Sequence, residues 1–292
     1  MFMRKISIIT GLLCLLFACD NEKTHPIRMI SVPKLEFISD RTIGKDSSQS
    51  IQIFLESFYI SDEITNKEYR EFTDWVKNNP EHILSKNKEV IGSKSEFGKT
   101  KVWTIPVFIT MADLLPNVID SSALYKLDKN YKNYFTDKKY DDYPVVGVSR
   151  TNAAYFCDWK TNFELVTEKV GHGKSKFYLT KGPETQFRLP IEMEWEYVAK
   201  QPLKSRVSND RSIKQVDKGS TNKWGISHLI DNVSEWVISP EDTLAIYRGG
   251  YWKTISNTSD RQWMHPDSSN GYTGFRIVRT YISLEINKKP DK

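Results

Sequence analysis

The segment Phe187-Arg-Leu-Pro-Ile-Glu-Met-Glu-Trp-Glu-Tyr-Val-Ala199 joins a short apolar stretch to a helix that begins after a proline. Proline is tolerated in the first turn of a helix because it has no N–H to leave unbonded. Three glutamates follow at alternate positions from Glu192, and Arg188 stands just before them. Carboxylates near a helix N-terminus are favourable partners for an arginine. We therefore expect Arg188 to be an architectural residue held by these carboxylates.

A strand and a capped helix are predicted upstream. Ile51 to Ile60 begins with alternating apolar and polar residues, which is typical of a half-buried strand. The pattern of a capping box follows in Thr65-Asn-Lys-Glu68, ahead of apolar residues at helical spacing. These residues are Tyr69, Phe72, Trp75 and Val76.

The second half of the chain again predicts a strand followed by a helix and then becomes irregular. Tyr143-Pro-Val-Val-Gly-Val-Ser149 predicts a strand that ends in a serine N-cap, with a helix after it. Residues 177–180 and 185–189 read as the strands of a hairpin. Beyond residue 220, glycines interrupt short aromatic segments, which indicates a loop-rich fold with little helix.

The N-terminus predicts export and a lipid anchor. Arg4 and Lys5 precede a short apolar run, as in a secretory signal. That run ends in Leu16-Phe-Ala-Cys19, which looks like a bacterial lipobox, with Cys19 as the lipidated first residue of the mature chain. An ordinary cleaved signal is the alternative. The predicted organisation is a signal peptide at 1–18, a tether at 19–50 whose apolar stretch 29–37 is a candidate early strand, a domain at 51–285 with an insertion at 80–142, and a tail at 286–292.

Cysteine content and charge limit the classes of protein. Of the three cysteines, Cys14 would leave with the signal and Cys19 would be lipidated, so that Cys157 would be the remaining thiol. The mature protein would then have no intrachain disulfide and would depend on a packed core. Loss of Arg4 and Lys5 lowers the formal net charge from +5 to +3. A charge this small does not favour nucleic acid as a partner.

Five segments in one order resemble the formylglycine-generating enzyme, or sulfatase-modifying factor, family. Together they cover about Ile51 to Tyr281, and they are 58–72, 143–159, 187–199, 224–236, and 247–252 with the closing 274–276. The resemblance implies an α+β fold, an irregular and loop-rich variant of the C-type lectin-like fold with few helices.

The same resemblance places an oxidase site at residues that have changed. The family uses two cysteines after its Gly-Gly motif to bind copper, and these positions fall at Thr254 and Ser259. A hydroxyl does not replace a soft thiolate for monovalent copper. The family's serine after Gly-Gly is Tyr251, and the tryptophan of its Asn-Val-Trp-Glu-Trp motif is Ser234. We therefore expect no copper and a degenerate cleft that comprises Ser234, Tyr251, Trp252, Thr254, Ser259 and Arg261.

Metal binding is implied only weakly. The family holds calcium through positions that match His228, Asp231, Val233 and Glu235 in this chain. Calcium prefers oxygen donors, so His228 argues against it, while Asp231 restores a charge. We expect no cofactor and leave calcium as an alternative. A related iron-dependent branch needs a histidine cluster, and the histidines at 25, 82, 172, 228 and 265 form none in the sequence.

One subgroup matches the departures. The lipidated gliding-motility proteins of the Bacteroidota type IX secretion machinery resemble this chain in three segments: 62–72, 140–149, and Asn-Val-Ser-Glu-Trp at 232–236. The resemblance implies a non-catalytic scaffold, lipid-anchored in the outer membrane, that binds envelope proteins of a secretion or motility complex.

Two other functions remain open at this point. The first is an enzyme with altered chemistry in the same cleft, using Ser259, Asp260, Arg261 or His265. The second is a glycan or surface-ligand binder in which Tyr251, Trp252 and Trp263 offer aromatic platforms.

Overall fold

The computed structural model describes residues 27–43, 47–80, 83–94, 100–110, 117–167, 185–204, 207, 210–239 and 244–281. The helices are α1 (Asn66–Asn78), α3 (Ala123–Leu127), α4 (Arg150–Thr167), α5 (Glu192–Ala199) and the 3-10 helix η2 (Lys138–Tyr140). The strands are β1 (Met29–Val32), β2 (Leu35–Ile43), β3 (Ser47–Leu55), β4 (Phe58–Glu63), β5 (Ile83–Lys94), β6 (Thr100–Thr110), β7 (Thr185–Arg188), β8 (Ser234–Val237), β9 (Ala245–Arg248), β10 (Arg261–Met264), β11 (Thr273–Gly274) and β12 (Arg276–Tyr281). Few helices, open sheets and long connections make this the expected loop-rich α+β class.

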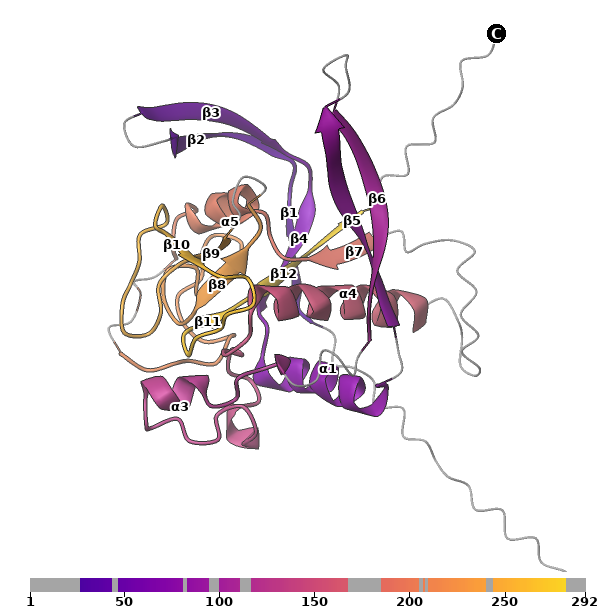
Figure 1. Ribbon diagram of the computed structural model, residues 1–292. Helices are drawn as coiled ribbons and strands as arrows, with labels where there is room; N and C mark the ends of the chain where they lie inside the picture. The colour runs from indigo at the N-terminus through magenta and orange to yellow at the C-terminus, as the bar shows by residue number, and fades with distance from the viewer. Residues whose placement is uncertain are drawn as a thin grey trace, which may run out of the picture.

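The first sheet brings both ends of the domain together. Its order is β1-β4-β12-β7, and all three pairings are antiparallel (Figure 1). The central strand β4 therefore lies between the most N-terminal and the most C-terminal strands. Glu63, its last residue, pairs in register with Arg276, the first residue of β12. This pairing places two charged side chains at the end of the sheet.

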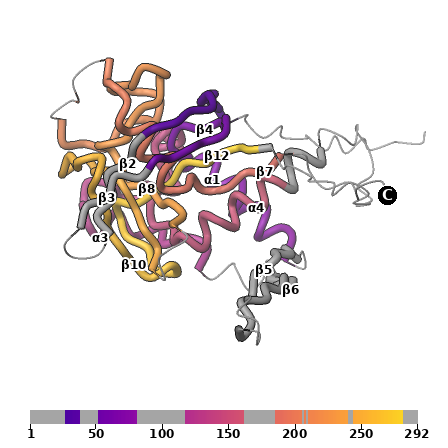
Figure 2. The backbone as a smooth tube through the Cα atoms, turned by 90° about the horizontal axis from the view of Figure 1, so that it is seen from above, coloured from indigo at the N-terminus to yellow at the C-terminus, as the bar shows by residue number. Residues whose placement is uncertain are grey.

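The second sheet and the loops next to it carry most of the residues that the sequence singled out. Its order is β10-β9-β8-β11, with β8 and β11 parallel and the other pairs antiparallel (Figure 1). Figure 2 shows β8 and β10 of this sheet from above. Strand β8 begins at Ser234 and includes Glu235. Strand β9 ends at Arg248, just before the Gly-Gly pair. Because β8 and β9 are antiparallel, the loop after β9 and the loop before β8 lie at the same end of this sheet.

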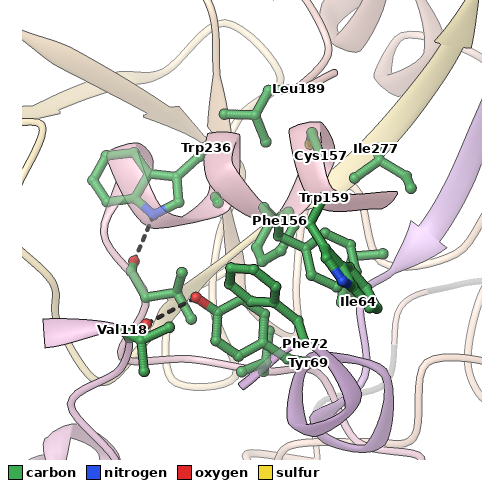
Figure 3. Packing of buried hydrophobic residues seen from close by; sticks show 14 of the residues in the cluster. Ile64, Tyr69, Phe72, Val118, Phe156, Cys157, Trp159, Leu189, Trp236 and Ile277 are labelled. Atoms are coloured by element: carbon green, nitrogen blue, oxygen red, sulfur yellow. Dashed lines mark hydrogen bonds between the residues drawn. The ribbon is translucent and has the colours of Figure 1, made fainter. Parts of the chain in front are cut away.

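An aromatic core fills the space between α1, α4 and the sheets (Figure 3). Tyr69 of α1 stacks on Phe156 of α4 with ring centroids 5.6 Å apart. Its hydroxyl donates to the carbonyl of Val118 at 2.8 Å. Trp236 of β8 donates from Nε1 to the carbonyl of Val148, also at 2.8 Å. Both buried polar tips are thus satisfied, as a packed aromatic core requires.

The predicted helices are confirmed, and one of the predicted strands is wrong. Thr65 and Glu68 form the capping box at α1, and Ser149 Oγ accepts from the N–H of Asn152 at the start of α4. Residues 143–149, however, form no strand and make only a single bridge, from Pro144 to Thr65. Pro144 lacks an N–H for a ladder, and Gly147 has a φ of +82°, which a strand does not accommodate.

The domain is larger than expected at its N-terminal side. Strand β1 pairs with β4 inside the first sheet, and Val32 is fully buried. The region expected to be a tether up to residue 50 therefore supplies a strand of the core sheet. The expected strand at 51–60 is divided between β3 and β4, because β3 pairs with β2 in a hairpin of its own.

The expected insertion at 80–142 also divides. Its first part, β5 and β6, forms a two-stranded sheet of its own. Its second part belongs to the core, because Val118 and Phe135 pack in the aromatic cluster of Figure 3 and Leu124 and Tyr134 pack in a neighbouring one. In the described part of the expected insertion, the hairpin of β5 and β6 thus lies outside the two four-stranded sheets.

Several expectations fall outside the described residues: the signal peptide, Cys19, residues 177–180 and the tail at 286–292. Strand β7, expected as half of a hairpin with 177–180, pairs with β12. None of the helices in the described part of the chain combines the length and the apolar character that crossing a bilayer needs.

Candidate functional site

The first group of cleft residues surrounds the Gly-Gly pair. Ser234 is buried, and its Oγ lies 3.2 Å from the carbonyls of both Gly249 and Gly250. Tyr251 and Thr254 exchange backbone hydrogen bonds of 2.9 and 2.7 Å across a tight turn. Thr254 itself is exposed. The Ser234 hydroxyl therefore fastens the loop backbone, while the Thr254 side chain faces solvent.

The two aromatic residues of this loop pack into the domain. The ring of Tyr251 stacks on Tyr272 with centroids 4.8 Å apart. Trp252 is only 5% exposed, and its backbone N–H donates to the carbonyl of Asn232. Within the described structure the Trp252 indole N–H has no acceptor. A small hollow lies beside them, lined by Asp210, Ser212, Lys214, Asp231, Asn232, Tyr251, Trp252 and Ile255.

The second group of cleft residues lies around Glu192, at the start of α5. Arg261 Nη2 donates to Glu192 Oε2 at 2.6 Å, and Arg248 contacts the same carboxylate. Ser259 is an exposed turn residue, and Arg248 donates to the carbonyl of its neighbour Thr258 at 2.5 Å. Ser234, Tyr251, Trp252 and Thr254 thus lie around the Gly-Gly pair, and Ser259 and Arg261 lie near Arg248, the residue just before that pair. Both arginines serve as partners of a buried glutamate.

The arginine prediction of the opening segment is confirmed. Arg188 holds Glu194 with two hydrogen bonds of 2.7 Å, one to each carboxylate oxygen. Glu194 Oε2 also accepts the N–H of Ile191, which closes the start of α5. Arg188 is therefore part of the helix N-terminus that the sequence suggested.

The residues proposed for an altered enzyme have local partners. Asp260 Oδ2 accepts from Ser256 Oγ and from the N–H of Asn257, which closes a surface turn. His265 is exposed, and its Nδ1 accepts the N–H of Asp267 at 3.2 Å. In the described structure no hydrogen bond joins Ser259, Asp260 and His265. Nucleophilic catalysis by a triad needs such bonds between its members.

The positions implied for calcium have other partners. Glu235 is fully buried and accepts from Arg276 and from Trp195 Nε1, at 2.5 to 2.7 Å. Asp231 faces His228, with Oδ1 3.1 Å from Nδ1 of the imidazole. Val233 is a core residue. Among the described residues, no group of three or more His, Cys, Asp or Glu side chains could hold a metal ion.

Two buried groups here have strongly shifted pKa values. Burial raises the pKa of Glu63 to about 8, although the nearby charge of His228 lowers it. Burial lowers the pKa of His228, but the charges of Glu63 and Asp231 outweigh this and raise it to about 9. Glu63 Oε2 accepts from Asn232 Nδ2 at 2.7 Å. We therefore expect His228 to be charged at neutral pH.

Glu63 and Asn232 are central to this network, and the sequence analysis did not select them. Both are almost fully buried. The signal available was the polarity of each within an apolar surrounding: Glu63 ends a strand of buried residues, and Asn232 precedes Val233 in the loop before β8. A polar residue at a core position needs a partner, which here lies 169 residues away.

The remaining thiol and the remaining aromatic platform lie apart from the cleft. Cys157 of α4 is buried in the aromatic core (Figure 3). Trp263 of β10 is half exposed and offers a ring to solvent, whereas Trp252 does not. The glycan interpretation therefore rests on Trp263 and on Tyr251, which is partly exposed.

Comparison with known proteins agrees with this fold. Residues 18–209 and 200–281 match the family described as "Sulfatase-modifying factor enzyme 1-like domain". Among solved structures, CarF is 18% identical, with a TM-score of 0.51 over 88% of this chain and 99% of CarF. PvdO from Pseudomonas aeruginosa is 15% identical, with a TM-score of 0.51 over 86% of this chain and 93% of PvdO. No curated protein sequence is significantly similar to the chain. The structural likenesses concern the fold alone.

Proposed function

We propose that this chain, which belongs to the sulfatase-modifying factor enzyme 1-like family, is a non-catalytic, lipid-anchored binding protein of the bacterial envelope. It would act as a scaffold for partner proteins of a gliding-motility or type IX secretion complex. Cys19 would carry the anchor, and the folded domain would present its loops to the partners.

One observation carries the non-catalytic part of the proposal. The positions that correspond to the copper cysteines are Thr254 and Ser259, and both are exposed. The only cysteine among the described residues is Cys157, which is buried in the core on α4. Copper-based oxygen chemistry of the family type needs two thiolates in one site. The side chains around Gly249 and Gly250 serve instead to fasten the loop.

The buried ion pairs support the same conclusion. Arg248 with Glu192 and Arg276 with Glu235 are nearly inaccessible to solvent. Such groups hold the sheets together, and in each pair the arginine and the glutamate neutralise one another. Ile255 and Trp263, which follow the Gly-Gly pair in the sequence, are exposed apolar side chains. A scaffold can use residues of this kind for contacts with partners.

A copper and oxygen assay tests the non-catalytic role. The purified chain is loaded with monovalent copper and mixed with oxygen and a thiol-containing substrate peptide. We expect no stoichiometric copper binding that depends on Thr254 or Ser259 and no oxygen consumption above that of the peptide alone. Turnover that the variant Ser259→Ala removes would overturn the proposal.

Membrane capture tests the anchor and the partners. We expect the native protein to sediment with membranes and to co-purify with envelope proteins, while Cys19→Ala is released. Cys157→Ala is the matched control, because that thiol is buried in the domain. A Cys19→Ala protein that stays on the membrane contradicts the anchor, and a monomeric protein with no envelope partner above background contradicts the scaffold.

A further inference from the structure

His228 lies at the junction of two loops that are separate in sequence. Its side chain is fully buried, and its backbone has a φ of +61°. One ring nitrogen, Nδ1, faces Asp231 Oδ1 at 3.1 Å within its own loop. The other, Nε2, faces the carbonyl oxygen of Gln215 at 3.3 Å. The ring thus bridges the loop before β8 and the segment 213–219.

Both partners of the ring are acceptors. A neutral imidazole has one N–H donor, whereas the protonated ring has two. A carboxylate on one side and a carbonyl on the other are both satisfied only when each ring nitrogen carries a proton. The geometry alone therefore favours the charged form of His228, independent of any titration.

The segment 213–219 is built to receive this ring. Gly219 has a φ of +119°, and a Cβ at this position would lie 2.6 Å from Cε1 of His228. The imidazole therefore packs directly on the backbone of the segment. Asn232 adds a second fastening, because its Oδ1 accepts the N–H of Lys214 at 2.9 Å and its Nδ2 lies 3.3 Å from the Lys214 carbonyl.

Four charged or titratable side chains from different elements surround the His228 ring. Asp231 lies on the same loop, Glu63 ends β4, Glu235 is on β8 and Arg276 is on β12. Glu235 is occupied by Arg276. Asp231 is the carboxylate that contacts the imidazole, whereas Glu63 accepts a hydrogen bond from Asn232. Lys214 directs its ammonium to Asp210, at 3.6 Å, on the outer side of the segment.

This arrangement does not fit the calcium that the family resemblance implies. Calcium needs six to eight oxygen ligands and does not favour nitrogen. Of the four corresponding positions, His228 offers nitrogen, Glu235 is bound by Arg276 and Trp195, and Asp231 is bound by the imidazole. The carboxylates that would neutralise a metal ion are neutralised by side chains of the protein.

We infer that the imidazole of His228 is an internal clamp that holds the segment 213–219 against the loop before β8, so that this domain keeps its structure without a bound calcium ion. This clamp is a structural feature of the domain, and the inference does not depend on the proposed scaffold role. It also secures one wall of the hollow beside Trp252, because Lys214, Asp231 and Asn232 line that hollow.

The first test uses the unmodified full chain and compares its thermal unfolding in excess EGTA and in millimolar calcium chloride. We expect the two melting temperatures to agree within about 1 °C, since a ligand that binds the native state raises the melting temperature with its concentration. A melting temperature that falls in EGTA and recovers with added calcium would overturn the inference.

The second test asks whether the clamp is the histidine. In His228→Asn we expect amide hydrogen exchange of residues 213–219 to speed up by at least about tenfold relative to the unmodified chain, because both ring contacts are lost. His265→Asn, which changes an exposed histidine, is the control and leaves this exchange unchanged. Unaltered protection of the segment in His228→Asn contradicts the inference.

A third measurement does not require a folded variant. In the unmodified chain labelled with ¹⁵N-histidine, we expect one buried imidazole to show two protonated ring nitrogens at pH 7.5. Assignment comes from the contact of its ring protons with Gly219, whose backbone lies against the ring. A neutral tautomer for that ring would mean that one of the two acceptors is unpaired and would contradict the clamp.

Discussion

Arg276 of β12 and Glu235 of β8 form a fully buried ion pair that joins the two sheets. Nε and Nη2 of the arginine donate to the two carboxylate oxygens at 2.6 and 2.5 Å. The same guanidinium donates to the carbonyl oxygens of Ser61 and Ser227, at 2.8 and 3.0 Å. One side chain therefore connects β4, β8, β12 and the loop after Gly225. The pair is a structural centre of the domain.

Removal of this arginine should be strongly destabilising. Arg276→Met leaves the Glu235 carboxylate buried without its counter-charge, and breaking a buried pair in this way costs about 3–5 kcal/mol. Urea unfolding followed by tryptophan fluorescence measures the free energy. Lys34→Ala is the control, because Lys34 and Glu56 form an exposed pair at 2.8 Å, and such pairs contribute about 0–1 kcal/mol. Equal losses in the two variants would show that the buried pair is not structural.

The capping box of α1 predicts a smaller and local effect. Thr65 Oγ1 accepts the N–H of Glu68 at 3.2 Å, and the glutamate accepts the N–H of Thr65 at 2.7 Å. Thr65→Ala should cost about 1 kcal/mol in the free energy of unfolding. Ser122→Ala is matched to it, because Ser122 is the N-cap of α3 and makes no side-chain capping bond. The prediction fails if the two alanine variants are equally stable.

The elements that could be predicted from the sequence are those fixed by near neighbours. The capping box at Thr65, the N-cap at Ser149 and the Arg188 to Glu194 pair each involve residues within six positions of one another. Local hydrogen bonds of this kind leave a pattern in the sequence. They located α1, α4 and α5, whereas the fold class came from the resemblance carried by the five segments.

The features that the sequence did not reveal depend on distant partners. The apolar stretch at 29–37 is visible in the sequence, but the place of residues 29–32 in the core sheet depends on their pairing with β4. Asn232 and Glu63 become a pair only when the loop before β8 meets the end of β4. The backbone bonds between Tyr251 and Thr254 and the bond from Arg261 to Glu192 are likewise contacts that the resemblance did not specify.

Gly250 should tolerate no side chain. A Cβ there would lie 2.3 Å from the carbonyl oxygen of Ile230 and 2.4 Å from that of Thr254, and backbone atoms do not move aside cheaply. Gly250→Ala should therefore destabilise the domain by about 3 kcal/mol or more. Its partner variant is Gly225→Ala, where φ is +83° but a Cβ would lie 3.5 Å from its nearest neighbour, Nη2 of Arg28.

The two glycine variants separate close packing from backbone strain. Gly225→Ala places an alanine in the left-handed region, which costs about 1–2 kcal/mol. Thermal unfolding of both proteins measures the difference. If Gly250→Ala is as stable as Gly225→Ala, the loop after β9 does not pack as the structure shows.

The stability of the domain should fall as the pH rises above neutral. The folded-state pKa of His228 is raised to about 9, so its contribution is complete below its unfolded pKa near 6.5 and is lost as the pH rises through 9. The pKa of Glu63 is raised to about 8, so the native state also binds a proton there that the unfolded chain releases above about 4.5. Both groups bind more protons in the native state, and their effects have the same sign.

The size of this effect is bounded by linkage. For each extra proton that the native state binds, the free energy of unfolding falls by up to about 1.4 kcal/mol for each unit by which the pH rises. Urea unfolding at pH 6, 7.5 and 9 should therefore show a decrease across the series. In His228→Asn the decrease between pH 7.5 and 9 should be smaller, because one of the two groups is gone, whereas His265→Asn should follow the unmodified chain. A stability that rises between pH 7.5 and 9 would mean that the imidazole does not hold its proton between Asp231 and Gln215.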